Sequence, residues 1–208
     1  MISMADYSMY VKKTDAGLVV IVIYVDDLII TGDDKAQIAN VKKVLGAEFD
    51  MKNLGELMYF LGIEVVRTPK GIWLLQRKYV LYILKTYGMT ACKPIATPIE
   101  QNAKLRADLG DKLEDPTMYK KMVGSLIYAT LTRPDMCHDV GVLIQFMQVP
   151  RKPHLDVARR ALRYAKGTRN HGLFYAYGAE VEVFGYTDTD WEMTGDPRVD
   201  VFLVLEAP

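Results

Sequence analysis

Apolar positions near the start of the chain follow a strand pattern that two acids interrupt. Residues 19–25 are β-branched or aromatic and lack polar alternation, which is typical of a strand covered on both faces. Asp26 and Asp27 break this run, and residues 28–31 resume it before Gly32. The pattern predicts a tight hairpin with two carboxylates at its tip.

The remaining pattern predicts a mixture of helices and hairpins, so the expected fold class is α+β. The helices are indicated by apolar residues that recur every three or four positions. The predicted elements are, in order, a helix over 35–49, two strands over 59–67 and 71–76 joined by a turn, a helix over 78–87, three antiparallel helices between 118 and 170, and a strand over 181–187 that ends at Asp188. Residues 93–117 are rich in proline and charge, which favours a linker.

Composition is that of an ordinary globular protein, and the charge is unevenly distributed. The 208 residues are 50% hydrophobic and 25% charged, which excludes a disordered chain or a disulfide scaffold. The net charge is zero, both overall and over residues 1–117. Residues 118–170 hold 10 basic and 3 acidic residues, a net charge of plus seven, and residues 171–208 carry minus seven. The basic block could bind phosphate.

Cysteine spacing and hydropathy indicate an intracellular protein, in the cytoplasm or the nucleus. Cys92 and Cys137 match no metal or redox motif, so we expect two reduced thiols and no disulfide partner. The chain has no secretory signal. Its longest apolar run, residues 18–25, is far below the roughly 20 residues that span a membrane, so no membrane partner is expected.

Asp26 and Asp27 have two possible roles. Adjacent aspartates form solvated turns well, and the pair could do no more than that. The pair could also bind a divalent metal, since Mg²⁺ takes oxygen ligands and usually only one or two protein carboxylates plus substrate phosphates. A hairpin tip is one place where neighbouring side chains can approach the same ion.

The full string at residues 24–27, Tyr-Val-Asp-Asp, resembles the Tyr-x-Asp-Asp box of reverse transcriptases. The resemblance extends over residues 7–191 to the polyprotein of copia-type (pseudovirid) LTR retrotransposons, from the C-terminal part of the reverse transcriptase domain into the start of the RNase H domain. The motifs that carry it, in the family's order, lie at residues 24–32, 51–64, 76–79, 97–98, 132–135, 162–168 and 185–191.

This resemblance implies a fragment of an RNA-directed DNA polymerase with a two-metal mechanism. The metal would be Mg²⁺ or Mn²⁺, with Asp26 as the firm ligand and Asp27 beside it. Tyr24 and Val25 would lie near the incoming nucleotide or the primer end. The implied partners are an RNA or DNA primer–template duplex and, if the fragment is active, deoxynucleotides.

The resemblance also implies a division of the chain. Residues 1–92 would be a partial palm built of antiparallel hairpins and helices, and residues 93–117 a linker. Residues 118–170 would be a basic helical thumb or connection region. Residues 171–208 would be the truncated start of an RNase H-like domain, with a divergent tail and Asp188 as the first catalytic, metal-binding carboxylate.

A row of basic residues falls on one face of the last predicted helix. It comprises Arg159, Arg160, Arg163 and Lys166. The row could be a solvated helix face. With the resemblance we expect it to contact duplex phosphates, which position a nucleic acid without reading its sequence.

The sequence departs from the family in its catalytic carboxylates. The family's third polymerase carboxylate lies on a strand upstream of the Asp-Asp hairpin, and the residues before Tyr24 contain no match to it or to the fingers. We therefore expect an excerpt that is catalytically inactive alone. The alternatives are a remnant that binds nucleic acid without sequence preference, and a relic with no molecular function.

Overall fold

The chain forms two compact units, Met1–Leu57 and Met58–Pro208. The computed structural model describes residues 7–100, 105–178, 182–189 and 199–206, the last two stretches by their backbone. Within these residues, no helix is both long and apolar enough to cross a lipid bilayer.

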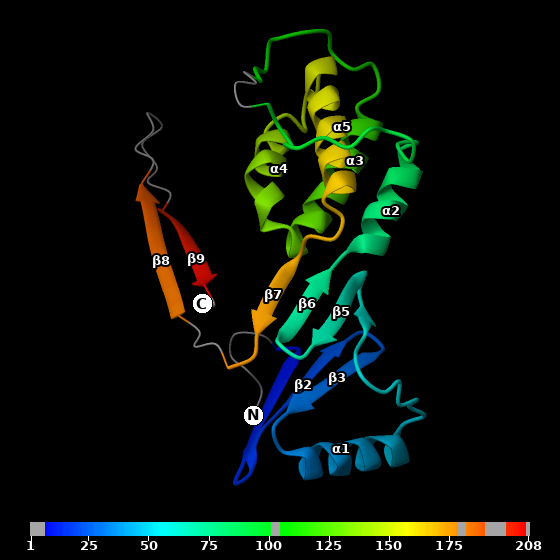
Figure 1. The fold of residues 1–208 in the computed structure, drawn as a ribbon, viewed down its shortest axis with the longest axis vertical. Coiled ribbons are helices and arrows are strands. Elements are labelled where there is room, and N and C mark those ends of the chain that lie inside the picture. Colours follow the sequence, from blue (N-terminus) through cyan, green and yellow to red (C-terminus); the bar gives the residue numbers. More distant parts are fainter. Residues whose placement is uncertain (1–6, 101–104, 179–181, 190–198, 207–208) are drawn as a thin grey trace. The chain divides into compact units, whose positions relative to one another are not determined.

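The first unit is a three-stranded antiparallel sheet with one helix beside it (Figure 1). Its elements are β1 (Met9–Thr14), β2 (Gly17–Tyr24), β3 (Asp27–Gly32) and α1 (Lys35–Glu48). The predicted hairpin and helix are confirmed, and β2 is the central strand. β1 was not predicted, because its apolar positions are few and two consecutive lysines, Lys12 and Lys13, break their alternation.

Asp34 caps the start of α1. It lies just after β3, at the open end of the β2–β3 hairpin and far from the hairpin tip. Its carboxylate accepts the N–H of Gln37 at 2.8 Å and the hydroxyl of Thr14 at 2.7 Å. These bonds lower the pKa of Asp34, and the bond from Gln37 has the larger effect. The same carboxylate therefore caps the helix and ties it to the end of β1.

The sheet of the first unit is only partly buried. Val19 is the one buried residue among residues 7–57. Leu18 and Ile23 lie on opposite faces of β2, and each is 38% exposed. One helix covers only one face of a sheet, so the expected covering of β2 on both faces is not met within this unit.

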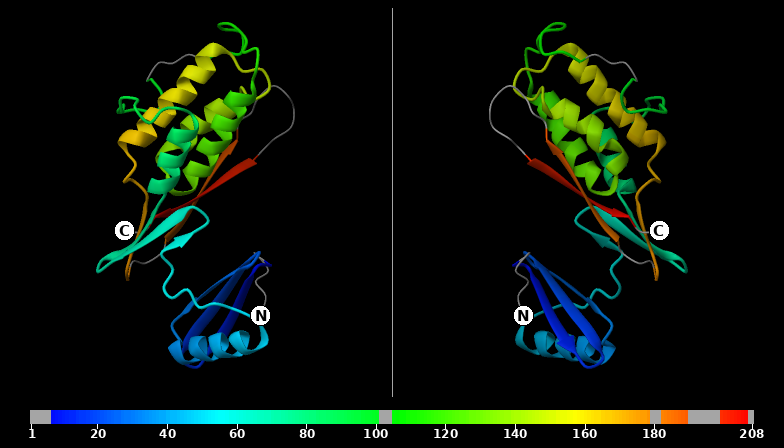
Figure 2. Two further views of the ribbon diagram at one scale, coloured as in Figure 1. Left: turned by 90° about the vertical axis from the view of Figure 1, so that its right-hand side faces the viewer. Right: turned by 90° about the vertical axis from the view of Figure 1, so that its left-hand side faces the viewer.

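The second unit combines a four-stranded sheet with a bundle of helices (Figures 1 and 2). Its elements are β4 (Tyr59–Phe60), β5 (Ile63–Thr68), β6 (Gly71–Leu75), α2 (Arg77–Thr86), α3 (Thr117–Ala129), α4 (Cys137–Ile144), α5 (Lys152–Gly167) and β7 (Leu173–Ala176), with 3-10 turns at Thr130–Thr132 and Pro134–Met136. β8 (Glu182–Thr189) and β9 (Val199–Glu206) form a separate antiparallel pair. The expected α+β class is confirmed.

The four-stranded sheet differs from its prediction in two places. The single strand expected over 59–67 is broken at Leu61 and Gly62, whose φ angles of 47° and 78° form a tight turn between β4 and β5. β7 was not predicted, and it pairs with β6 so that Phe174 packs on Trp73 at 4.7 Å between ring centroids. Residues expected in separate domains therefore share one sheet.

The helices of the second unit enclose its hydrophobic core. All three helices predicted between residues 118 and 170 are present, and α2 packs with them. The fully buried apolar side chains include Ile83, Leu84, Met122, Leu126, Leu143 and Leu162. Burial of each such side chain contributes about 1.5–3 kcal/mol to stability. This core holds α5 in a fixed position.

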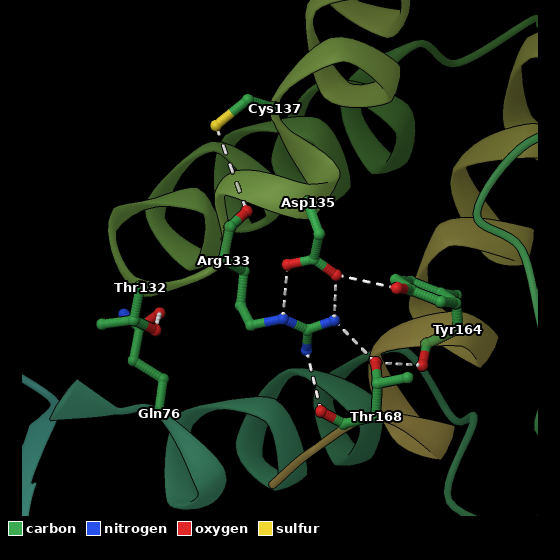
Figure 3. Close-up of polar contacts among 7 residues, drawn as sticks. All are labelled: Gln76, Thr132, Arg133, Asp135, Cys137, Tyr164 and Thr168. Carbon is green, nitrogen blue, oxygen red and sulfur yellow. Dashed lines mark hydrogen bonds and ion pairs between the residues drawn. The ribbon is translucent and has the colours of Figure 1, made fainter. Parts of the chain in front are cut away.

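Arg133 is the centre of a buried polar network at one end of this core (Figure 3). It is 2% exposed, and its guanidinium donates two hydrogen bonds to Asp135, at 2.9 and 2.7 Å. It also donates to the carbonyl and hydroxyl of Thr168, at 3.0 and 2.6 Å. Although burial pushes the pKa of Asp135 upward, the bonds from Arg133 and Tyr164 outweigh it and lower that pKa. The network joins the turn before α4 to the end of α5.

A second polar cluster fixes the start of α2. Glu64 of β5 is buried and accepts two bonds from Arg77, at 3.1 and 2.8 Å, and the N–H of Lys78. Burial raises the pKa of Glu64, but these bonds together lower it. The buried Gln76 accepts the hydroxyl of Thr132 at 2.9 Å. The cluster therefore joins the sheet to the helices.

His154 lies fully buried in the first turn of α5. Its Nδ1 accepts the N–H of Arg151 at 3.1 Å, so its Nε2 carries the hydrogen and donates to the carbonyl of Arg106 at 3.1 Å. Phe146 stacks on the ring at 3.9 Å. Burial, joined by the positive charge of Arg151, lowers the pKa of His154 despite the bond to Arg106.

Replacing Arg133 by lysine should destabilise the second unit by about 3 kcal/mol, because an ammonium cannot make all four bonds and leaves polar groups unpaired. Urea unfolding followed by circular dichroism measures the loss. Arg106→Lys is the matched control: Arg106 makes the same two-bond pair with Asp108, but the side chains are 68% and 69% exposed. This change should cost less than about 1 kcal/mol. Equal losses would contradict a structural role for Arg133.

Acidification from pH 7 to 5 should lower the free energy of unfolding through His154. Below a pH of about 6.5, His154 takes up a proton in the unfolded chain but not in the folded chain, where its pKa is lowered. The free energy of unfolding therefore falls by up to about 1.4 kcal/mol per pH unit. Urea unfolding at several pH values measures this slope. His154→Gln should flatten it, and His171→Gln, at an exposed site, should leave it unchanged. An unaltered slope in His154→Gln would disprove the assignment.

Candidate functional site

The tip of the β2–β3 hairpin presents the Tyr-Val-Asp-Asp string. Tyr24 and Asp27 are paired across the strands, so Val25 and Asp26 form a two-residue loop. Val25 has a φ of 51°, in the left-handed region that a β-branched residue rarely adopts. Hairpin loops of two residues need a positive φ and usually take it from glycine or asparagine. The loop therefore keeps valine where the backbone is strained, a feature that clusters at functional sites.

All four side chains of the tip are exposed. Tyr24 is 49% and Val25 81% exposed, and Asp26 and Asp27 are also exposed. Exposed carboxylates can approach a cation without the cost of burying an unpaired charge. The same exposure suits a solvated turn, so the geometry of the tip accommodates both roles considered for the pair.

A two-metal centre needs more oxygen ligands than the hairpin tip supplies. Asp26 and Asp27 are ligands of the hard type that Mg²⁺ or Mn²⁺ prefers. Among the described residues, however, no three His, Cys, Asp or Glu side chains come together in a way that could hold a metal ion. The described part of the chain therefore offers two candidate ligands but does not complete such a centre.

The four basic residues predicted to contact phosphates lie along α5, where they have different partners. Arg159 is exposed and makes one long ion pair, at 3.4 Å, with Asp156 of the preceding turn. Arg160 is largely covered and donates to the carboxylate of Glu100 at 2.9 Å and the hydroxyl of Thr97 at 3.1 Å. Of these two arginines, Arg160 is the one with hydrogen bonds to the segment before α3 in the described structure.

The next two basic residues bind main-chain carbonyls of the same segment. The Nε of Arg163 donates to the carbonyl of Lys93 at 2.8 Å. The ammonium of Lys166 donates to the carbonyls of Thr90 and Cys92, at 2.6 and 2.7 Å. These cations hold this chain segment against the helix.

That segment, residues 90–100 and 105–111, is called the strap below. Its later part lies at the other end of α5, where Arg151 donates to the carbonyl of Gly110 at 2.6 Å and Lys152 pairs with Asp111 at 2.8 Å. Apart from turns, its described residues form neither helix nor strand. The sequence predicted a linker over most of this region, and the structure shows a segment held by hydrogen bonds.

The sequence did not reveal the partners of the basic residues. The spacing of Arg160, Arg163 and Lys166 shows that they share one helix face. It does not show what meets that face, because most acceptors are main-chain carbonyls, which every residue carries. Glu100 is a single acid far away in the sequence, and no local pattern connects it to α5.

Asp188 lies in β8, one residue before the end of that strand, and is opposite Asp200 of β9 in the register. The predicted strand is confirmed, whereas β9 was not predicted. The backbone alone is described here, so the expected role of the Asp188 side chain lies outside the described part. Asp188 belongs to the second unit and Asp26 and Asp27 to the first.

Comparison with known proteins identifies the first part of the chain. A profile of the family described as "Reverse transcriptase (RNA-dependent DNA polymerase)" matches residues 2–101. The match includes the whole β2–β3 hairpin. No solved structure matches the chain.

Relatives cover most of the chain. It is 42% identical over 197 residues to the retrovirus-related Pol polyprotein from transposon RE1 of Arabidopsis thaliana, and 37% identical over 204 residues to that from transposon TNT 1-94 of Nicotiana tabacum. These alignments cover 95% and 92% of this chain, but only 13% and 15% of the polyproteins. An uncharacterized mitochondrial protein of Arabidopsis thaliana is 38% identical, and the alignment covers 82% of this chain and 71% of that protein.

The profile, the relatives and the motifs agree on one family. The profile matches the segment that contains the Tyr-Val-Asp-Asp hairpin, and the Pol polyproteins extend the similarity across α5 and beyond. The chain therefore belongs to the reverse transcriptase family of copia-type retrotransposon Pol polyproteins.

Proposed function

We propose that this chain carries the metal-binding hairpin of a retrotransposon RNA-directed DNA polymerase. The observation that supports this role is the exposed, strained tip of the β2–β3 hairpin, which presents two adjacent carboxylates. Asp26 is the firm metal ligand and Asp27 the neighbouring one, while Tyr24 and Val25 lie near the nucleotide or the primer end. When bound, Mg²⁺ or Mn²⁺ activates the primer hydroxyl and stabilises the leaving pyrophosphate.

Alone, the chain is catalytically inactive. Two exposed carboxylates bind a divalent ion weakly, and no third ligand joins them among the described residues. Reaction of a primer with a nucleotide requires the reacting atoms to be held about 3–3.5 Å apart. The hairpin tip by itself provides no such restraint.

A similar proposal applies to residues 182–189. Asp188 is the first carboxylate of an RNase H-like site, which needs several acids around paired metal ions. Support comes from the motif at residues 185–191 and from the Pol polyprotein alignments, which cover most of the chain.

The proposed location of the protein is inside the cell. Two free cysteines, Cys92 and Cys137, fit an intracellular protein.

The chain also binds nucleic acid through its helical region, without sequence preference. Residues 118–170 carry a net charge of plus seven, and Arg159 of α5 is exposed. Contacts from such cations to phosphates do not depend on base identity. A copying enzyme needs this kind of contact.

Primer extension tests the catalytic proposal. With RNA or DNA template, all four deoxynucleotides and Mg²⁺ or Mn²⁺, the purified chain should give no synthesis above an Asp26→Asn control, because its metal site is incomplete. Robust synthesis that Asp26→Asn abolishes would overturn the inactivity while supporting the role of the hairpin.

Mn²⁺ binding tests the hairpin separately from activity. In NMR spectra, Mn²⁺ should broaden the amide signals of residues 24–27 at ion concentrations of about 0.1–1 mM, the range of weak carboxylate sites. The double change Asp26→Asn and Asp27→Asn should remove the broadening. Asp33→Asn is the control, because Asp33 is an exposed acid at the far end of β3. Broadening that persists in the double variant would reject the site.

Salt dependence tests the nucleic-acid proposal. Fluorescence anisotropy with a labelled oligonucleotide should show affinity that falls steeply with salt, with a logarithmic slope of about −0.9 for each duplex phosphate neutralised. Arg159→Ala should reduce the magnitude of this slope by about one such contact. Lys35→Ala, in the electrically neutral part of the chain, should leave it unchanged. Binding that does not respond to salt would contradict the proposal.

A further inference from the structure

The strap runs antiparallel to α5 along the basic face of that helix. Its first residues lie at Lys166, its middle at Arg160, and its last residues at Arg151. The hydrogen bonds to the strap are formed by Lys152, Arg160, Arg163 and Lys166 of this face, and at the start of the helix by Arg151 and the buried His154. The basic face is therefore already occupied by a segment of its own chain.

This occupant leaves much of the positive charge unpaired. Within the described strap, the acids that pair with α5 are Glu100 and Asp111. Arg163 and Lys166 meet neutral carbonyl groups, which supply no negative charge. The bonds to these carbonyls have an ionised donor only, whereas phosphate would add the attraction between opposite charges, so phosphate would be the stronger ligand for both cations.

Arg160 is held more firmly than the acid that pairs with it. Its side chain is only 20% exposed, while that of Glu100 is 70% exposed. Its Nε is buried without a hydrogen-bond partner among the described residues. Glu100 can thus swing into water while the guanidinium keeps its position, open to another oxyanion of similar geometry.

We infer that the strap and nucleic-acid phosphates compete for the basic face of α5, so that the strap is an intramolecular occupant which nucleic acid displaces. The inference rests on the proposed nucleic-acid binding and adds a mode of regulation to it. Arg160, Arg163 and Lys166 span about 9 Å of helix axis, which matches roughly three phosphates of one strand at 3.4 Å per nucleotide.

Two opposing effects set the balance of this competition. The strap is tethered, so its effective concentration at the helix is on the order of millimolar or higher. Phosphates offer charged acceptors in place of neutral ones and release counterions, an advantage that is largest at low salt. The strap should therefore be displaced at low ionic strength and should stay in place at high ionic strength.

Glu100→Gln weakens the strap without changing α5, and Glu114→Gln is the matched control. Glu114 carries the same charge, is exposed, and makes no hydrogen bond or ion pair with α5 in the described structure. By anisotropy with a labelled single-stranded DNA at low salt, Glu100→Gln should bind about fivefold more tightly than Glu114→Gln, the effect expected of a partly exposed ion pair. Equal affinities would overturn the competition.

Limited proteolysis with a protease of broad specificity gives an independent readout of the strap in the wild-type chain. On addition of saturating DNA, cleavage within residues 90–100 should become faster because a displaced strap is accessible, whereas cleavage within the α3 core should not. Slower or unchanged cleavage would mean that DNA binds over the strap, and the inference would fail. An absence of DNA binding in all three proteins would instead reject the proposed function on which the inference rests.

Discussion

The buried guanidinium of Arg133 is the interaction on which the second unit depends. A charge removed from water must be paired and hydrogen-bonded to be tolerated, and Asp135 and Thr168 together satisfy this one. Because Thr168 directly follows α5, the network sets where that helix ends. The chain then enters β7, which pairs with β6. One buried cation therefore links the helical bundle to the sheet.

The fixed position of α5 gives its basic face a function within the chain. The motif at residues 162–168 supplies both Thr168, which faces Arg133, and two cations that face the strap. The same short string therefore serves two opposite sides of one helix. The positive face of α5 in this chain thus binds the strap as well as being a candidate phosphate site. On the inference drawn above, the face would become available to nucleic acid only when the strap leaves it.

The hairpin tip and the α5 face owe their geometry to different kinds of interaction. Local residues alone form the tip, since a two-residue loop brings Asp26 and Asp27 together and strains Val25. A site that consists of one loop can be recognised in a sequence, but its ligands are few. The face of α5 depends on contacts between residues far apart, such as Arg160 with Glu100. Only folding brings these residues together.

The sequence by itself determined the elements with strong periodicity and the family. The hairpin at residues 19–31, α1 and the three later helices follow from local apolar patterns, and the Tyr-Val-Asp-Asp string identified the reverse transcriptase relationship. A local turn at Leu61 and Gly62 separates β4 from β5, which the apolar pattern did not reveal. Tertiary structure alone decided that β7 joins β6 and that the expected linker is a bound strap. Both features rest on hydrogen bonds to main-chain groups of distant segments. Every residue offers the same main-chain groups, so the sequence carries no local signal for their pairing.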